Sequence, residues 1–169
     1  MEARPVQKEP LTIGWREWAA LPELNVRAIK AKIDTGARTS ALHAYRIEPF
    51  RRAGALWLRF ELHPLQRSDA MTVACEAPAI DERMVKNSGG GTERRYVIRT
   101  LLKLGDEAWP IELALANRDQ MGFRMLLGRT ALEGRALIEP GRSYLLGGRT
   151  ASTTRGSKPR PHKIGRLLR

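Results

Sequence analysis

The chain has 169 residues, of which 42% are hydrophobic and 6% aromatic, and it carries a formal net charge of +12 at pH 7. This length suits one domain with its own core, and no apolar run approaches the roughly 20 residues of a membrane-spanning helix. The first ten residues lack the apolar segment of a secretory signal, and a lone cysteine, Cys75, excludes an internal disulfide. We therefore expect a cytoplasmic protein without a membrane contact.

The positive charge is uneven along the chain. Residues 149–169 contain seven basic residues and no acidic ones, and subtracting these from +12 leaves +5 for the rest. We expect residues 1–10 to form a flexible arm, residues 11–148 one folded domain, and residues 149–169 a disordered basic tail. Such a tail suits RNA contact through counterion release, and a solvated tail without a partner explains the same composition.

The predicted elements are mostly short strands, because apolar and polar residues alternate between turn-forming residues. We expect strands at 11–18, 26–33, 40–45, 56–62, 71–75, 83–87, 96–104, 111–116, 123–127, 137–138 and 144–146. A single short helix is expected at 129–134, near the C-terminal end of the domain, where Gly134 ends it. This pattern predicts an all-β fold, either a closed barrel or a closed sandwich.

The first motif follows the strand predicted at 26–33. Residues 29–44 read I-K-A-K-I-D-T-G-A-R-T-S-A-L-H-A, so that the strand runs directly into Asp34, Thr35 and Gly36. A carboxylate at a strand end, next to a glycine, can be held rigidly in a cleft with its oxygens exposed. A solvated turn explains these three residues equally well when they are considered alone.

A second motif lies far downstream. Residues 117–132 read N-R-D-Q-M-G-F-R-M-L-L-G-R-T-A-L, which predicts a buried strand that breaks at Gly128 into a short helix. The two motifs together resemble the retropepsin-like aspartic peptidases. The longer runs resemble one bacterial family of that type, labelled ATP-dependent zinc proteases and often encoded beside glutamate ligases of the ATP-grasp type. The resemblance covers roughly residues 13–147.

The resemblance implies a retropepsin-like β-barrel in which two carboxylates share one proton and activate water. Because the chain has only one D-T-G, it further implies a homodimer with Asp34 of each copy at the two-fold axis. Thr35 would brace the two loops through its hydroxyl, and Gly36 would let the backbones approach. No cofactor is expected, since no P-loop or H-E-x-x-H motif supports the ATP or zinc label.

Residues 88–91 are expected to form the tip of a lid over the substrate. Ser88, Gly89 and Gly90 begin this glycine-rich tip between two extended arms, in the place that the retropepsin flap occupies. A surface hairpin without a function is the simpler alternative. We include these three residues among the expected substrate-binding positions.

Arginines are the clue to the substrate. Arg38 follows the D-T-G-A run, where retroviral enzymes typically carry an acidic residue, and Arg94 and Arg95 follow the glycine-rich tip. Guanidinium groups bind carboxylates with two hydrogen bonds, so these residues favour an acidic, glutamate-rich or polyglutamylated protein tail. A ribosomal protein is one candidate substrate. Arg129 is expected to pair within the chain, either with Glu93 or with Asp119.

Two other functions remain open from the sequence. Cys75 is an alternative nucleophile, with His43 or His63 as its base, although a lone cysteine beside Val73 and Ala74 is usually a small buried side chain. The other alternative is a non-catalytic β-barrel module that binds ribosomal RNA or an acidic protein. The leading hypothesis is a homodimeric peptidase that uses Asp34 and acts on glutamate-rich tails.

Overall fold

The structure is a computed structural model that describes residues 8–65, 70–86, 89–117 and 122–147. The order of elements is β1 (Leu11–Gly14), β2 (Arg16–Leu21), the 3₁₀ turn η1 (Pro22–Leu24), β3 (Val26–Ile33), β4 (Ser40–His43), β5 (Tyr45–Arg52), β6 (Ala55–Leu62), β7 (Val73–Lys86), β8 (Thr92–Leu104), β9 (Glu107–Ala116), β10 (Met125–Leu127), α1 (Arg129–Leu132) and β11 (Ala136–Glu139). None of the described helices is long and apolar enough to cross a membrane. The predicted tail at 149–169 lies outside the described residues.

Six strands close into a barrel. Their order is β2-β3-β10-β4-β9-β8, and pairing of β2 with β8 completes the ring. Alternation along each strand directs apolar side chains inward, and fully buried examples are Ile29, Leu42, Ile98, Leu102 and Leu113. The predicted all-β closed barrel is therefore confirmed, and closure leaves the ring without a free strand edge.

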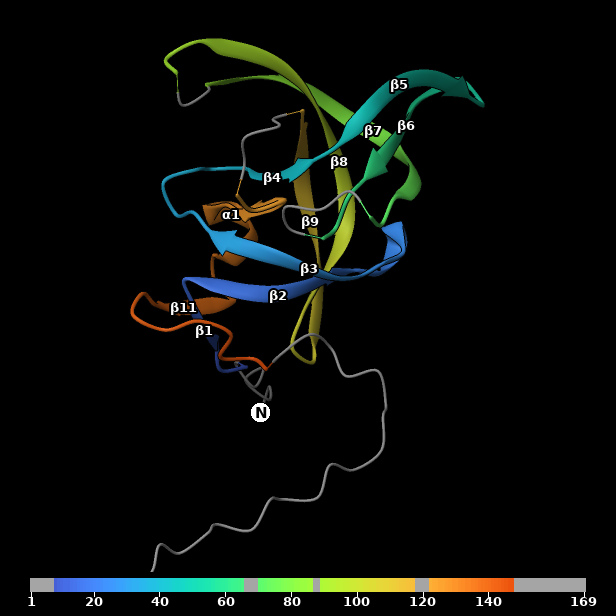
Figure 1. Ribbon diagram of the computed structural model, residues 1–169. Helices are drawn as coiled ribbons and strands as arrows, with labels where there is room; N and C mark the ends of the chain where they lie inside the picture. The colour runs from blue at the N-terminus through green and yellow to red at the C-terminus, as the bar shows by residue number, and fades with distance from the viewer. Residues whose placement is uncertain (1–7, 66–69, 87–88, 118–121, 148–169) are drawn as a thin grey trace, which may run out of the picture.

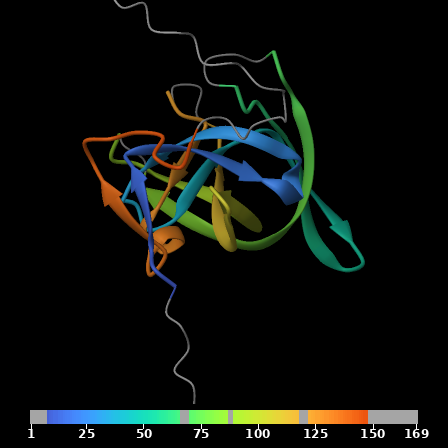
Figure 2. The ribbon, with the colours of Figure 1, turned by 90° about the horizontal axis from the view of Figure 1, so that it is seen from below.

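Two long strands leave the barrel and carry the rest of the sheet. β7 has 14 residues and β8 has 13, and their paired ends arch above β4 and α1 in Figure 1. β6 and β5 follow β7 as the outer strands and project from one side of the barrel in Figure 2. The arched hairpin lies on the same side as the loop between β3 and β4, which makes this the side of interest for a substrate.

Four strand predictions were wrong, three in their boundaries and one because no strand forms there. The strand predicted at 11–18 divides at Trp15 into β1 and β2, because the chain turns there to pair β1 with β11. The strands predicted at 71–75 and 83–87 belong to one strand, β7, whose middle contains Pro78 and a bulge. Residues 144–146 form no strand, because their backbone is held by a buried side chain.

That side chain is Glu17 of β2, which is fully buried. Its carboxylate accepts hydrogen bonds from the backbone N–H groups of Gly14 at 2.8 Å, Leu145 at 2.9 Å and Leu146 at 3.0 Å. Three backbone donors, one just before β2 and two near residue 145, satisfy the buried carboxylate. They attach the end of the described chain to the barrel. This role of Glu17 was not predicted from the residue pattern around it.

Candidate active site

The loop that contains Asp34 connects two strands that do not pair with each other. β10 lies between β3 and β4, parallel to β3 and antiparallel to β4. The loop therefore crosses the end of β10, and the Asp34 N–H donates to the Leu127 carbonyl at 2.9 Å. Leu127, at the end of the strand predicted from the second motif, thus lies directly under the D-T-G loop.

The other end of the loop is bonded to the start of α1. Ala37 accepts a hydrogen bond from the Arg129 N–H at 2.8 Å, and the Arg38 carbonyl accepts two from Thr130. Gly128 donates to the Ser40 hydroxyl at 2.9 Å. A Cβ at position 128 would lie 2.7 Å from the Thr39 carbonyl carbon, so that only glycine permits this approach. The loop is therefore fixed along both sides.

The functional groups stand at the tip of this fixed loop. Asp34 is half-buried, and its carboxylate has no hydrogen-bond or ion-pair partner among the described residues. Thr35 and Gly36 are exposed, and the Arg129 guanidinium donates to the Thr35 carbonyl at 2.9 Å. A Cβ on Gly36 would lie 3.3 Å from the Asp34 Oδ1 atom, so a larger residue would crowd the carboxylate. This arrangement suits general acid–base chemistry by a pre-positioned carboxylate.

Comparison with known proteins agrees with this geometry. Residues 12–148 match the RimB-like family, described as the retropepsin-like aspartic endopeptidase RimB. The chain belongs to the RimB-like family. It is also similar to a solved protein from Legionella pneumophila, Lpg0085 of unknown function, with a TM-score of 0.69 and 27% identity over 82% of this chain and 99% of that one.

Curated relatives of this RimB-like chain have a different name. Two proteins called probable alpha-L-glutamate ligase, from Shewanella pealeana and Parasynechococcus marenigrum, are 51% and 53% identical over 135 and 137 residues. The matches cover 80% and 81% of this chain but only 30% and 29% of those proteins. The RimB-like chain therefore spans less than a third of the length of these relatives.

The three arginines predicted to bind substrate differ in their exposure and in their ion pairs. Arg38 is exposed, and its side chain has no partner within the described ranges. Arg94 lies 3.6 Å from Glu82, across the β7–β8 hairpin. Arg95 is buried; it lies 3.3 Å from Glu93, while its Nε has no hydrogen-bond partner. Glu93 is therefore engaged by Arg95 rather than by Arg129.

The glycine-rich tip is described only in part. Gly89 and Gly90 are exposed between β7 and β8, and Gly90 has φ +84°, a conformation that favours glycine. Ser88 lies outside the described residues, as does Asp119, the other expected partner of Arg129. The lid role of this tip stays a prediction.

Cys75 lies in the core of the RimB-like chain. Burial raises the pKa of its thiol to about 11, and the Sγ atom faces the Leu24 carbonyl at 3.5 Å and the Val73 carbonyl at 3.7 Å. His43 and His63 instead lie against Tyr45, with ring centroids 4.4 and 4.1 Å away. A thiol held neutral at physiological pH is a poor nucleophile, so this environment favours a packing role.

One feature of the site was missed from the sequence. A hollow of about 370 Å³ opens beside the loop, with Arg38, Arg83, Arg99 and Glu112 among its lining residues. Arg83 and Arg99 look like ordinary polar positions in alternating strands, and only the folded structure, in which β7, β8 and β9 pair, shows that they line the same hollow as Arg38. Among the described residues, no three metal-ligating side chains lie close enough together to hold an ion.

Proposed function

We propose that two copies of the chain form an aspartic peptidase whose reactive pair is Asp34 from each copy. The observation that carries this proposal is the Asp34 carboxylate, half-buried and without a partner in the described ranges, on a loop anchored to β10 and α1. Membership of a family described as retropepsin-like aspartic endopeptidases supports it. Since each chain supplies one such loop, the pair requires a second copy.

The chemistry follows from placing two carboxylates close together. Repulsion between like charges keeps one proton on the pair, so that one member is a base while the other is an acid. The ionised carboxylate takes a proton from water as the water oxygen attacks the peptide carbonyl carbon. The protonated carboxyl gives its proton to the carbonyl oxygen, and the tetrahedral intermediate then breaks its C–N bond as the nitrogen is protonated.

The proposed substrate is an acidic, glutamate-rich tail of a modified cytoplasmic protein, with a ribosomal protein as one candidate. The arginines that border the loop favour carboxylate side chains. The relatives called probable alpha-L-glutamate ligase are consistent with it, since a peptidase that removes glutamates would act on the product of such a ligase. The lone buried thiol suits a reducing compartment.

Mass spectrometry of a peptide that ends in several glutamates tests the proposal. Wild type and Cys75→Ala are expected to shorten the peptide, whereas Asp34→Asn is expected to lose activity by about a thousandfold, since it removes the base. Size-exclusion chromatography with light scattering checks that all three form dimers. A monomeric wild type that still cleaves, or an active Asp34→Asn dimer, would refute the shared carboxylate pair.

A second candidate function has one specific observation in its favour. In the curated relatives, the segment that matches this chain makes up about 30% of a longer protein, which fits a module that presents an acidic tail to a ligase. Such a module would bind the glutamate peptide without cleaving it, and the Asp34→Asn change would leave its affinity intact. Fluorescence anisotropy with the labelled peptide separates binding without cleavage from catalysis.

A further inference from the structure

The hollow beside the Asp34 loop is built from five parts of the chain. Arg38 and Thr39 belong to the loop, Arg83 to β7, Arg99 to β8, and Glu112 to β9, while the start of α1 completes the wall. Its volume of about 370 Å³ falls in the range typical of small-molecule and side-chain pockets. It is therefore a formed feature of the fold, on the side where the β7–β8 hairpin arches over the loop (Figure 1).

The charge of the hollow is not balanced from within. Arg83 contacts Asp81 at 2.6 Å and Glu112 at 2.9 Å, so both of these carboxylates are already engaged. The pKa of Asp81 lies below its ordinary value chiefly because Arg83 donates a hydrogen bond to it. Arg38 and Arg99 have no ion pair or side-chain hydrogen bond in the part of the chain that is described. Two guanidinium groups are therefore left to face the hollow.

The pairing of strands explains why Arg99 stays unpaired. Its cross-strand neighbour on β9 is Glu112, the residue that would ordinarily neutralise it. Arg83 reaches Glu112 from β7, on the far side of β8, and takes that carboxylate. The ion pair between Arg83 and Glu112 therefore prevents Glu112 from pairing with Arg99, and the Arg99 guanidinium can bind a ligand.

The position of Arg38 relates the hollow to the reactive carboxylate. Its carbonyl is held by both the N–H and the hydroxyl of Thr130, at 3.1 and 2.8 Å, while its side chain is exposed. It lies four positions after Asp34 in the sequence, which limits the distance between their Cα atoms to about 14 Å. An extended peptide advances about 3.3 Å per residue, so the hollow lies within about four residues of a bond held at Asp34.

The remaining wall suits one kind of side chain. Pro110 is exposed and provides apolar surface beside the two free guanidinium groups, while Ile111 and Ala131, which also line the hollow, are almost fully buried. A glutamate side chain has two methylene groups and a terminal carboxylate with a single charge, so it matches both parts of the wall.

We propose that Arg38 and Arg99 form a specificity subsite that binds the side-chain carboxylate of a substrate glutamate within about four residues of the cleaved bond. This inference rests on the proposed function for the identity of the reaction, and it assigns the selection of acidic substrates to two named residues. Arg83 is a positioning residue that holds Glu112 away from Arg99.

The test uses a peptide with a tail of glutamates and a matched peptide with a tail of glutamines. The variants are Arg38→Gln, Arg99→Gln and the double change, and Arg51→Gln is the control because Arg51 is an exposed arginine on the distant β5 that contacts Gly54. Each single change is expected to lower the preference for the glutamate peptide, measured by kcat/KM, by about tenfold. The loss should lie in KM, since neither guanidinium touches the reacting atoms.

Binding of both peptides to the Asp34→Asn chain, followed by fluorescence anisotropy, separates this inference from the proposed reaction. If wild type cleaves neither peptide but the glutamate preference in binding disappears with Arg99→Gln, the proposed catalysis fails and the subsite stands. If cleavage proceeds and the double variant keeps the wild-type preference within about twofold, the subsite is refuted and catalysis stands. Loss of the glutamate preference in the Arg51→Gln control would also refute the subsite, because the preference would then depend on the net charge of the protein and not on Arg38 and Arg99.

Discussion

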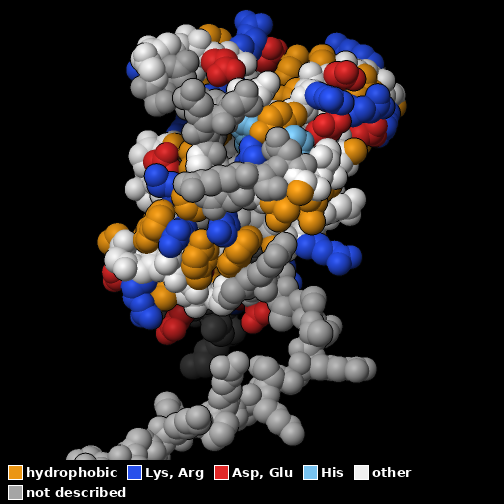
Figure 3. All heavy atoms as spheres, in the orientation of Figure 1, with side chains coloured by type: hydrophobic (Ala, Val, Ile, Leu, Met, Phe, Trp, Pro, Cys, Tyr) orange, Lys and Arg blue, Asp and Glu red, His pale blue; other side chains and the backbone are white. Residues whose placement is uncertain are grey.

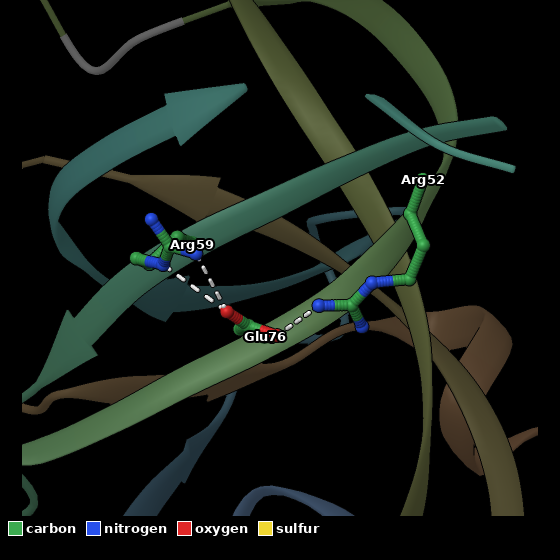
Figure 4. A network of polar contacts seen from close by, with 3 residues as sticks. All are labelled: Arg52, Arg59 and Glu76. Carbon is green, nitrogen blue, oxygen red and sulfur yellow. Dashed lines mark hydrogen bonds and ion pairs between the residues drawn. The ribbon is translucent and has the colours of Figure 1, made fainter. Parts of the chain in front are cut away.

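Two groups of arginines on this molecule differ in how their charge is balanced. On the outer strands β5 and β6, Arg52 and Arg59 both bind Glu76, at 2.6 and 3.0 Å, and Figure 4 shows the carboxylate lying between them. In the hollow beside Asp34, Arg83 occupies both acidic neighbours, and Arg38 and Arg99 have no partner among the described residues. The arginines of the first group are paired with a carboxylate of the chain itself, while those of the second are arranged to bind an anion.

Aromatic rings also contact the arginines of the outer strands, which adds to the difference between the two groups. The Arg52 guanidinium carbon lies 4.3 Å from the centre of the Trp57 ring, and that of Arg59 lies 5.0 Å from the centre of Phe50. Figure 3 shows basic and acidic side chains next to each other over this outer hairpin. A guanidinium that has both a carboxylate and a ring gains little from a new ligand. Arginine content alone therefore does not locate a binding site, whereas the pairing of each arginine does.

The largest effect on stability is expected at Glu17, because its carboxylate is fully buried. Replacing it with glutamine puts an amide N–H₂ group against backbone N–H donors that now share two carboxylate oxygens. We expect Glu17→Gln to lower the free energy of unfolding by about 3 kcal/mol, measured by urea denaturation. Glu76→Gln, at an exposed carboxylate that also accepts three hydrogen bonds, is the matched control. An equal loss in both variants would contradict the role of burial.

The fold and the contact between the D-T-G loop and the second motif could be predicted because their signals are local. The strand alternation before Asp34 and the break at Gly128 both lie in short runs of sequence, and the structure places the two motifs in contact. Register was harder, because nothing near β10 in the sequence shows that it inserts between β3 and β4. Those pairings join residues about 90 positions apart, so they depend on closure of the whole barrel.

The arginines proposed to bind an acidic substrate could be found from the sequence only in part, for the same reason. Arg38 was identified because it belongs to the D-T-G loop, and Arg94 and Arg95 because they follow the glycine-rich tip. Arg99 was missed, since in Tyr96 to Leu104 it looks like one more solvent-facing position of an alternating strand. Its significance comes from three strands at once: β9 supplies Glu112, β7 supplies Arg83, and the loop brings Arg38.

Removing Arg83 is expected to make the arginines of the hollow resemble those of the outer strands, because one of them would gain a carboxylate partner. Without it, Glu112 is free to pair with its cross-strand neighbour Arg99, so that the hollow loses one available guanidinium. We expect Arg83→Gln to raise KM for the glutamate peptide by about threefold, with kcat unchanged. The double variant Arg83→Gln with Glu112→Gln should restore the affinity, because Arg99 then has no carboxylate to bind. Failure of the second change to restore KM would show that Arg83 itself binds the substrate.

The smallest effect is expected at Glu76. Hydrogen bonds from Arg52 and then Arg59 hold the pKa of this carboxyl below its ordinary value of 4.5. A lowered pKa in the folded state means that the contacts stabilise the protein above pH 4.5, and that this contribution disappears as the pH falls through the lowered pKa. Glu76→Gln should therefore shift the urea midpoint slightly near neutral pH and not at all in strong acid, because water screens this exposed pair. High salt should reduce the shift at neutral pH, whereas a shift that persists in both acid and salt would mean that the carboxylate acts through packing rather than through its charge.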